Sequence, residues 1–142
     1  QNRTVNKEYI TLVNGVLTPT QEHDIIDKAI GRAHGRIARI AAHSQSLDSA
    51  KEAKTEYWVT KRLRHHTLLR VKIITGRTHQ IRVHMKYLNH PVVCDSLYNP
   101  DNPCPKGISR MALHAKSIEF KNLKDKTIKI ESPVPKEFSK YL

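Results

Sequence analysis

The sequence has few of the residues that build secreted, membrane or fibrous proteins. Only two of its 142 residues are cysteine, too few for a disulfide framework, so we expect a reducing compartment. No apolar run approaches the ~20 residues of a membrane-spanning helix, and no signal peptide or low-complexity repeat is visible. With 38% apolar and 27% charged residues, residues 1–142 are predicted to form a single globular domain.

Acidic residues are also scarce. The chain has 25 lysines and arginines against 13 aspartates and glutamates, which gives a formal charge of +12. Two long segments, 28–47 and 57–94, contain no acidic residue at all. This excess favours a polyanionic partner, most commonly a nucleic acid, bound through its phosphates. Such contacts give affinity and register rather than sequence specificity, and a merely solvated basic surface remains the alternative.

Short alternating segments predict most of the secondary structure. Strands are expected at residues 8–15, 56–63, 67–74, 112–120 and 127–132. Segment 18–35 is expected to be mostly loop, because Pro19, Gly31 and Gly35 interrupt it. His65 and His66, between the second and third of these strands, fit a hairpin turn poorly, because neither is a strong turn residue.

A helical period replaces the alternation between Arg77 and Leu88. Ile81, Met85 and Leu88 fall on one helix face, with Thr78 as the predicted N-cap. A loop is expected at 95–109 and a short terminal helix at 135–142. These elements predict an α+β fold with a mixed, mainly antiparallel sheet and few helices.

Nine histidines invite a metal-site hypothesis, but their spacing argues against one. His79 and His84 are five residues apart and do not share a helix face, as an i, i+4 ligand pair would. Cys94 and Cys104 match no zinc-ligand spacing. No phosphate-binding loop or Ser-His-Asp arrangement is visible. We therefore expect no metal site.

Seven segments carry a more specific pattern than charge does. The most specific is TGRTHQIRVH at 75–84. The others are KEY at 7–9, IGR at 30–32 with Arg36, KTEY at 54–57, NHPVVCDSLY at 89–98, RMALHA at 110–115 and PVP at 133–135. Taken in chain order, these segments resemble the motifs of the RluA-type family of RNA pseudouridine synthases. The resemblance implies a pseudouridine synthase catalytic domain that acts on structured RNA, ribosomal or transfer, in the cytoplasm. An organelle or the nucleus stays open.

The resemblance also implies the chemistry and two catalytic residues. Enzymes of this family flip a uridine out of its stack, break the C1′–N1 bond, turn the base and rejoin it through C5, without cofactor or metal. By resemblance Arg82 pairs with the catalytic aspartate and keeps it ionised. Tyr9 stacks on the flipped base, and its hydroxyl assists proton removal at C5. The alternatives are a phosphate contact for Arg82 and an ordinary strand residue for Tyr9.

Four further residues are candidates for substrate binding. They are Ile81, Arg77, Arg32 and Arg36. Ile81 is expected to pack against the uracil ring, with a core position as the alternative. Arg77, at the turn before the helix, could hold a phosphate together with the helix N-terminus. Arg32 and Arg36 are expected to contact RNA from a loop.

One family motif is missing. The catalytic aspartate of the family lies in an HRLD…TSG motif before the KxY strand, and none of the six aspartates here has that context. We therefore expect this chain to be the C-terminal portion of a catalytic domain, inactive alone. The N-terminal part would lie in the complete protein or in a separate chain. A non-catalytic RNA-binding or ribosome-assembly protein with the same fold is the alternative. A DNA-binding regulator is disfavoured, since no helix-turn-helix or zinc finger is visible.

Overall fold

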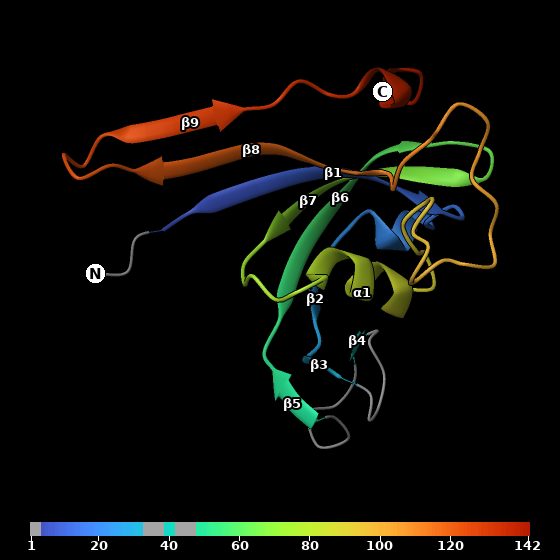
Figure 1. The fold of residues 1–142 in the computed structure, drawn as a ribbon, viewed down its shortest axis with the longest axis horizontal. Helices are drawn as coiled ribbons and strands as arrows, with labels where there is room; N and C mark the ends of the chain where they lie inside the picture. Colours follow the sequence, from blue (N-terminus) through green and yellow to red (C-terminus); the bar gives the residue numbers. More distant parts are fainter. Residues whose placement is uncertain (1–3, 33–38, 42–47) are drawn as a thin grey trace.

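The computed structural model describes residues 4–32, 39–41 and 48–142. This part of the chain contains short strands, one 3-10 helix and two short α-helices (Figure 1). In chain order they are β1 (Asn6–Asn14), η1 (Pro19–Gln21), β2 (His23–Asp27), β3 (Ile30–Arg32), β4 (Arg39–Ala41), β5 (Asp48–Lys51), β6 (Lys54–Arg62), β7 (His66–Ile73), α1 (Gln80–Tyr87), β8 (Leu113–Lys121), β9 (Thr127–Glu131) and α2 (Lys136–Ser139).

A six-stranded antiparallel sheet forms the body of the molecule. Its strand order is β2-β6-β7-β1-β8-β9, so the first strand of the chain pairs with two strands that follow much later. β1 has a strand on each side, and its residues from Ile10 to Val13 are buried on both faces of the sheet. Every pairing between the described strands is antiparallel, which confirms the mainly antiparallel α+β prediction.

The two α-helices lie on opposite sides of the sheet (Figure 1). The His84 side chain of α1 is hydrogen-bonded to the Thr55 hydroxyl of β6, 2.7 Å away, which fastens α1 to one face. Phe138 of α2 is buried in the same hydrophobic core as Ile10, whose side chain points to the other face because strand residues alternate. Neither described helix is long and apolar enough to cross a membrane.

β6 and β7 form a hairpin, which Leu63 and His66 close through a backbone hydrogen bond of 2.9 Å. Asn89, with φ of 64°, follows α1 in the left-handed conformation common after a helix C-terminus. The predicted N-cap was wrong: His79 occupies that position, with φ of 57° and no side-chain cap.

The prediction that residues 18–35 are mostly loop was wrong. They contain η1, β2 and β3. In β2 only Ile26 is buried, because β2 is an edge strand paired on one side with β6. An edge strand exposed in this way carries no alternating apolar pattern, so its sequence gave no strand signal.

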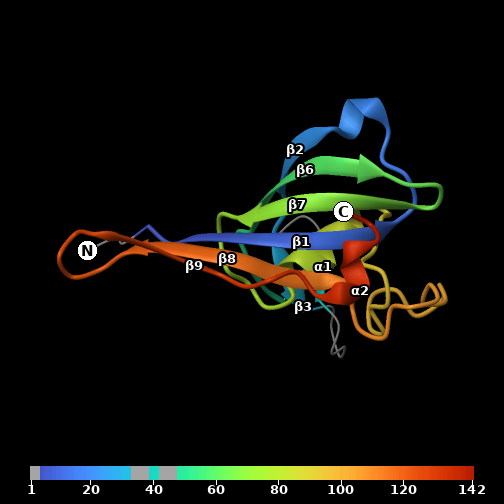
Figure 2. The same cartoon turned by 90° about the horizontal axis from the view of Figure 1, so that it is seen from above.

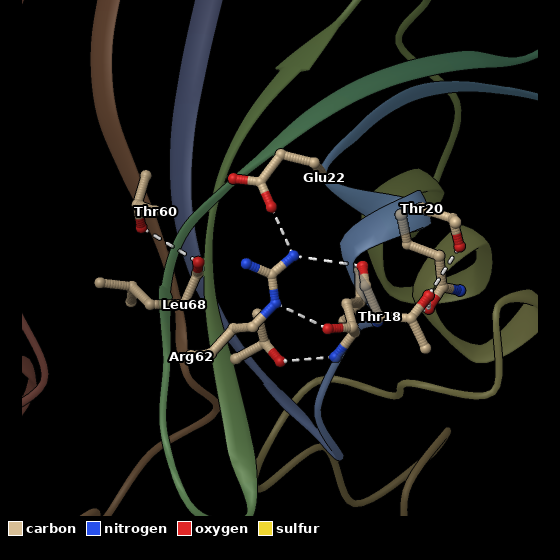
Figure 3. Close-up of polar contacts among 9 residues, drawn as sticks. Thr18, Thr20, Glu22, Thr60, Arg62 and Leu68 are labelled. Carbon is tan, nitrogen blue, oxygen red and sulfur yellow. Dashed lines mark hydrogen bonds and ion pairs between the residues drawn. The ribbon is translucent and has the colours of Figure 1, made fainter.

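Arg62 at the end of β6 fixes the chain that leaves β1 (Figure 3). Its guanidinium donates to the carbonyl oxygens of Leu17 and Thr18, at 2.7 Å and 3.1 Å, and to the Glu22 carboxylate. Arg62 therefore has a structural role, although its place in the acid-free segment suggested either phosphate contact or a solvated surface.

β8, β9 and the start of β1 form an arm that projects beyond the rest of the sheet (Figure 2). A bulge between Glu8 and Tyr9 shifts the β1–β8 register where the arm leaves the core. The part of β1 near Thr11, beyond the arm, lies between the two helices. The start of β1, within the arm, is not covered by a helix.

Cys94 and Cys104 form a disulfide, which the sequence analysis did not anticipate. Cys94 has φ of 62°, a backbone conformation that favours glycine. The bond joins Cys94 to the exposed Cys104 within the irregular segment between α1 and β8.

Candidate functional site

The N-terminus of α1 is held to β6 by one buried amide. The Gln80 side chain accepts hydrogen bonds from the Thr75 hydroxyl and the Arg77 backbone N–H, at 2.8 Å and 3.0 Å. It donates to the Lys54 carbonyl and the Thr55 hydroxyl, at 2.8 Å and 2.9 Å. All four bonding directions of this side chain are thus used. Gln80 therefore sets the position of the helix residues that follow it.

Arg82, two residues later, forms a two-point ion pair with Asp95. Its Nε and Nη2 donate to the two carboxylate oxygens, at 2.7 Å and 2.9 Å. The Asp95 side chain is fully buried, and that of Arg82 is 18% exposed. Oδ1 of Asp95 also accepts the backbone N–H groups of Leu97 and Tyr98. One buried carboxylate thus orients the guanidinium and organises the turn that follows.

These bonds fix the charge state of the pair. Burial by itself raises the pKa of Asp95, but the hydrogen bonds from Arg82 and from the Tyr98 amide outweigh it, so the pKa lies below its ordinary value. The hydrogen bond to Asp95 likewise raises the pKa of Arg82. Both groups are therefore charged at neutral pH.

Tyr98 supports the guanidinium from a second direction. The Arg82 Cζ lies 5.0 Å from the centre of the Tyr98 ring, within cation–π range. The Tyr98 hydroxyl is hydrogen-bonded to Nδ1 of His79 at 2.9 Å. His114 is hydrogen-bonded to the Ser132 carbonyl. Both histidines thus bond to protein groups next to the site.

One edge of the Arg82 guanidinium is not used by these contacts. Of its five N–H groups, two bond to Asp95, and the remaining three have no acceptor among the residues that the structure describes. Since the side chain is partly exposed, this edge can bind a second anion, such as a carboxylate or a phosphate.

Tyr9 lies on the face of the sheet that carries α1. It is opposite Val71, which is in turn opposite Tyr57, two residues along β6 from the Thr55 that bonds α1. Residues in these register positions share one face. Between described residues no hydrogen bond joins Tyr9 to Arg82, which bonds to Asp95 instead.

A hollow of about 290 Å³ lies beside Tyr9 at the base of the arm. Ala115, Ile118 and Ile130 contribute most of its apolar wall, and Lys7 lies at its side. Burial raises the pKa of the Tyr9 phenol, so this side chain is neutral at physiological pH. The ring can stack on a planar group, whereas a tyrosinate base is disfavoured here.

The predicted substrate-binding residues lie at several different places. Ile81 is 5% exposed and belongs to the main core, which matches the alternative foreseen for it. Arg77 is half-buried, and its Nε donates to the Glu52 carbonyl at 2.7 Å. Arg32 is exposed on β3, in the small three-stranded sheet. Arg36 lies outside the described residues.

Sequence reasoning missed Asp95 and Tyr98 as parts of the site. One signal could have found the aspartate: Asp95 is the first acidic residue after the long acid-free segment that ends at Cys94. An isolated acid at that position suggests a specific cationic partner. Among the described residues, no group of three His, Cys, Asp or Glu side chains is arranged to hold a metal ion.

Comparison with known proteins gives a consistent result. A family model described as RNA pseudouridylate synthase matches residues 1–87. The Vibrio cholerae protein named ribosomal large subunit pseudouridine synthase D is 36% identical over 147 residues, covering 95% of this chain and 43% of that protein. An uncharacterized RNA pseudouridine synthase of Helicobacter pylori is 36% identical over 138 residues, covering 97% and 51%.

Solved structures give the same picture. Human RNA Pseudouridylate Synthase Domain Containing 1 superposes with a TM-score of 0.75 and 28% identity, covering 92% of this chain and 55% of that one. Human RNA Pseudouridylate Synthase Domain Containing 4 has a TM-score of 0.72 at 21% identity, a similarity of fold alone. The chain spans about half the length of the relatives it matches.

Proposed function

The chain belongs to the RNA pseudouridylate synthase family, and from this premise we propose that the complete protein isomerises uridine to pseudouridine in RNA. The reaction breaks the C1′–N1 bond of a flipped uridine and joins C1′ to C5. The proton on C5 leaves, and N1 gains one, so the overall change is an isomerisation.

The observation that carries this proposal is the fixed guanidinium of Arg82. Asp95 holds one edge of it, and the other edge has no acceptor in the described structure. A catalytic aspartate could bind that free edge, which would keep the incoming carboxylate ionised and oriented toward C1′. Lysine would serve poorly, because only a planar guanidinium can present two edges to two carboxylates.

Tyr9 has the second role in the proposed site. It lies on the α1 face of the sheet beside an apolar hollow, and its phenol is neutral. We assign the ring to stacking on the flipped base. Its neutral hydroxyl could relay the C5 proton through a hydrogen bond, without first becoming a tyrosinate.

Arg77, Arg32 and Arg36 are proposed to contact phosphates, and Ile81 to shape the wall of the base pocket from within the core. Arg77 keeps N–H groups besides the one bonded to Glu52, so it can reach an anion from the turn before α1. These contacts would give affinity and register on the RNA.

The nucleophilic aspartate is proposed to come from outside residues 1–142. Asp95 cannot take its place, because its side chain is fully buried and already accepts four hydrogen bonds. The greater length of the relatives leaves room for such a segment, in the same polypeptide or in a separate chain. The second candidate, a non-catalytic RNA-binding protein, is favoured by the same burial of Asp95 if no such segment exists.

Tritium release from RNA labelled at uridine C5 separates the two candidates. The complete protein should release tritium, whereas chain 1–142 should bind RNA without releasing any. Release by chain 1–142 would mean that another of its aspartates is the nucleophile. Absence of release from the complete protein, with every candidate RNA, would leave the binding protein as the function.

Arg82→Ala in the complete protein tests the assigned residue. Turnover should be lost while RNA affinity is largely kept, because the guanidinium is proposed to act on the aspartate and not on phosphates. Arg64→Ala, at an exposed residue of the β6–β7 turn, is the matched control and should keep turnover. A parallel collapse of RNA binding in Arg82→Ala would reassign Arg82 to phosphate contact.

Ribosomal RNA is the first substrate to test, since several relatives are named for the large ribosomal subunit, and transfer RNA is the second. A cytoplasmic location goes with this proposal, because both RNAs are used there.

A further inference from the structure

The disulfide closes a ring around the turn that holds Arg82. Cys94 immediately precedes Asp95, and Cys104 lies 10 positions further along the chain. Their Cα atoms are 5.0 Å apart, inside the range in which two cysteines can be bridged without moving the backbone. The segment closed by the disulfide therefore contains Asp95 and Tyr98, the two residues that position the Arg82 guanidinium.

The two halves of the ring are anchored differently. In the first half, Asp95, Tyr98 and Asn99 are buried, and Asn99 donates to the Val92 carbonyl at 3.0 Å. The second half, from Pro100 to Cys104, is exposed. Among described residues, its side-chain ties to the first half are the Asn102–Asn99 hydrogen bond and the disulfide. Breaking the disulfide therefore leaves Asn102 as the described side-chain tie between the exposed half and the buried half.

We propose that Cys94 and Cys104 are a reversible thiol modification site whose disulfide tightens the turn holding Arg82. The oxidant is a low-molecular-weight disulfide such as oxidised glutathione. The exposed Cys104 thiolate attacks one of its sulfurs, forming a mixed disulfide and releasing one thiol. The Cys94 thiolate then attacks the Cys104 sulfur and releases the second thiol. The two protein thiols lose two protons and two electrons, and the small disulfide gains them.

The location of the pair distinguishes it from a purely structural bond. One partner is exposed and therefore accessible to small thiols and disulfides, and only 10 positions separate the two. In a reducing compartment such bonds are usually transient or redox-sensing rather than permanent. The thiol chemistry stands by itself, whereas an effect on turnover rests on the proposed function.

Chain 1–142 equilibrated with oxidised or reduced glutathione tests the chemistry. After oxidation, alkylation should leave both cysteines unmodified, and the mass should be lower by two hydrogen atoms. Hydrogen exchange of the Leu97 and Tyr98 amides should slow, with an upper limit of about 100-fold set by loop-closure entropy, while β1 and β7 amides should not change. The Cys104→Ser variant, altered at an exposed position, should match the reduced protein under both conditions.

Two results would overturn the proposal. The first is full alkylation of both cysteines after oxidation. The second is exchange at Leu97 and Tyr98 that does not depend on the redox state. In the complete protein, pseudouridine formation at one rate in both redox states would refute the effect on turnover. If the exchange responds to oxidation but neither redox form makes pseudouridine, the proposed function fails and the modification site stands.

Discussion

The substitution Asp95→Asn should lower the free energy of unfolding more than any other single aspartate-to-asparagine substitution in this chain. The substitution keeps the shape and leaves one acceptor oxygen for the Leu97 and Tyr98 amides. It places an amide N–H₂ where Oδ2 now accepts the Arg82 Nε–H, so donor faces donor. Arg82 is then a largely buried cation without its counter-ion.

The expected cost follows from the burial of the two groups. Breaking a buried ion pair by removing one partner typically costs about 3–5 kcal/mol. Because Arg82 keeps 18% of its side chain exposed, water can solvate it in part. We therefore expect the lower end of that range, about 3 kcal/mol at pH 7.

Urea unfolding of chain 1–142, followed by circular dichroism, measures this cost. Asp101→Asn is the matched control, since Asp101 is exposed in the same irregular segment, and it should change stability by less than about 0.5 kcal/mol. The double variant Asp95→Asn/Arg82→Met should lose less stability than the sum of the losses in the two single variants. Each single variant leaves one buried charge without its partner, whereas the double variant removes both charges. If Asp95→Asn costs no more than Asp101→Asn, the pair does not hold the turn and the argument fails.

The same pair predicts an acid limit. The pKa of Asp95 is lowered in the folded state, so its contribution to stability is complete above the unfolded-state pKa of about 3.9 and is lost as the pH falls through the folded-state pKa. The difference in stability between the native protein and Asp95→Asn should therefore shrink only in strong acid. A difference that shrinks near neutral pH would show that another group carries it.

Three further predictions concern other parts of the molecule. Burial lowers the pKa of His84, so stability should fall as the pH drops below the unfolded-state pKa of about 6.5. The variant His84→Gln should weaken this dependence of the urea unfolding midpoint on pH. An unchanged dependence would contradict the assignment. RNA affinity should fall steeply with salt, measured by filter binding, and a flat response would refute the phosphate-contact surface. Tyr9→Phe should keep RNA affinity, whereas Tyr9→Ala should lose roughly 1–3 kcal/mol of stacking; equal losses would reject the stacking role.

Local sequence patterns were enough to predict most of the strands and α1. β1, β7 and β9 alternate, β6 is rich in β-forming residues, and α1 shows a helical period at Ile81 and Met85. The order of these strands in the sheet could not be predicted, because it depends on which strand edges pair when the chain folds. β2 was missed for a related reason: its strand conformation comes from pairing with β6 and not from its own pattern.

The site was predictable in part. The resemblance identified Arg82 and Tyr9, but not what holds them in place. Asp95 reaches Arg82 across 13 positions, and Gln80 takes over the start of α1 from the expected Thr78 cap by bonding to a distant strand. Such side-chain contacts between elements have no fixed spacing in a sequence. The disulfide could not be predicted for the same reason, because the positions of two cysteines in a sequence do not show how far apart they lie in the fold.

The central place of β1 has a consequence for how this chain is made. Thr11 donates to the Ala112 carbonyl, a partner 101 residues away, and both long edges of β1 wait for strands synthesised later. On the ribosome, β1 emerges before β7 and β8, and the edge of β1 that faces β8 stays unpaired until the partner 101 residues further along is translated. Sheets with such distant pairings fold slowly and expose apolar strands meanwhile. Nascent chains should therefore depend on chaperones over this interval, with β1 as the segment that needs protection.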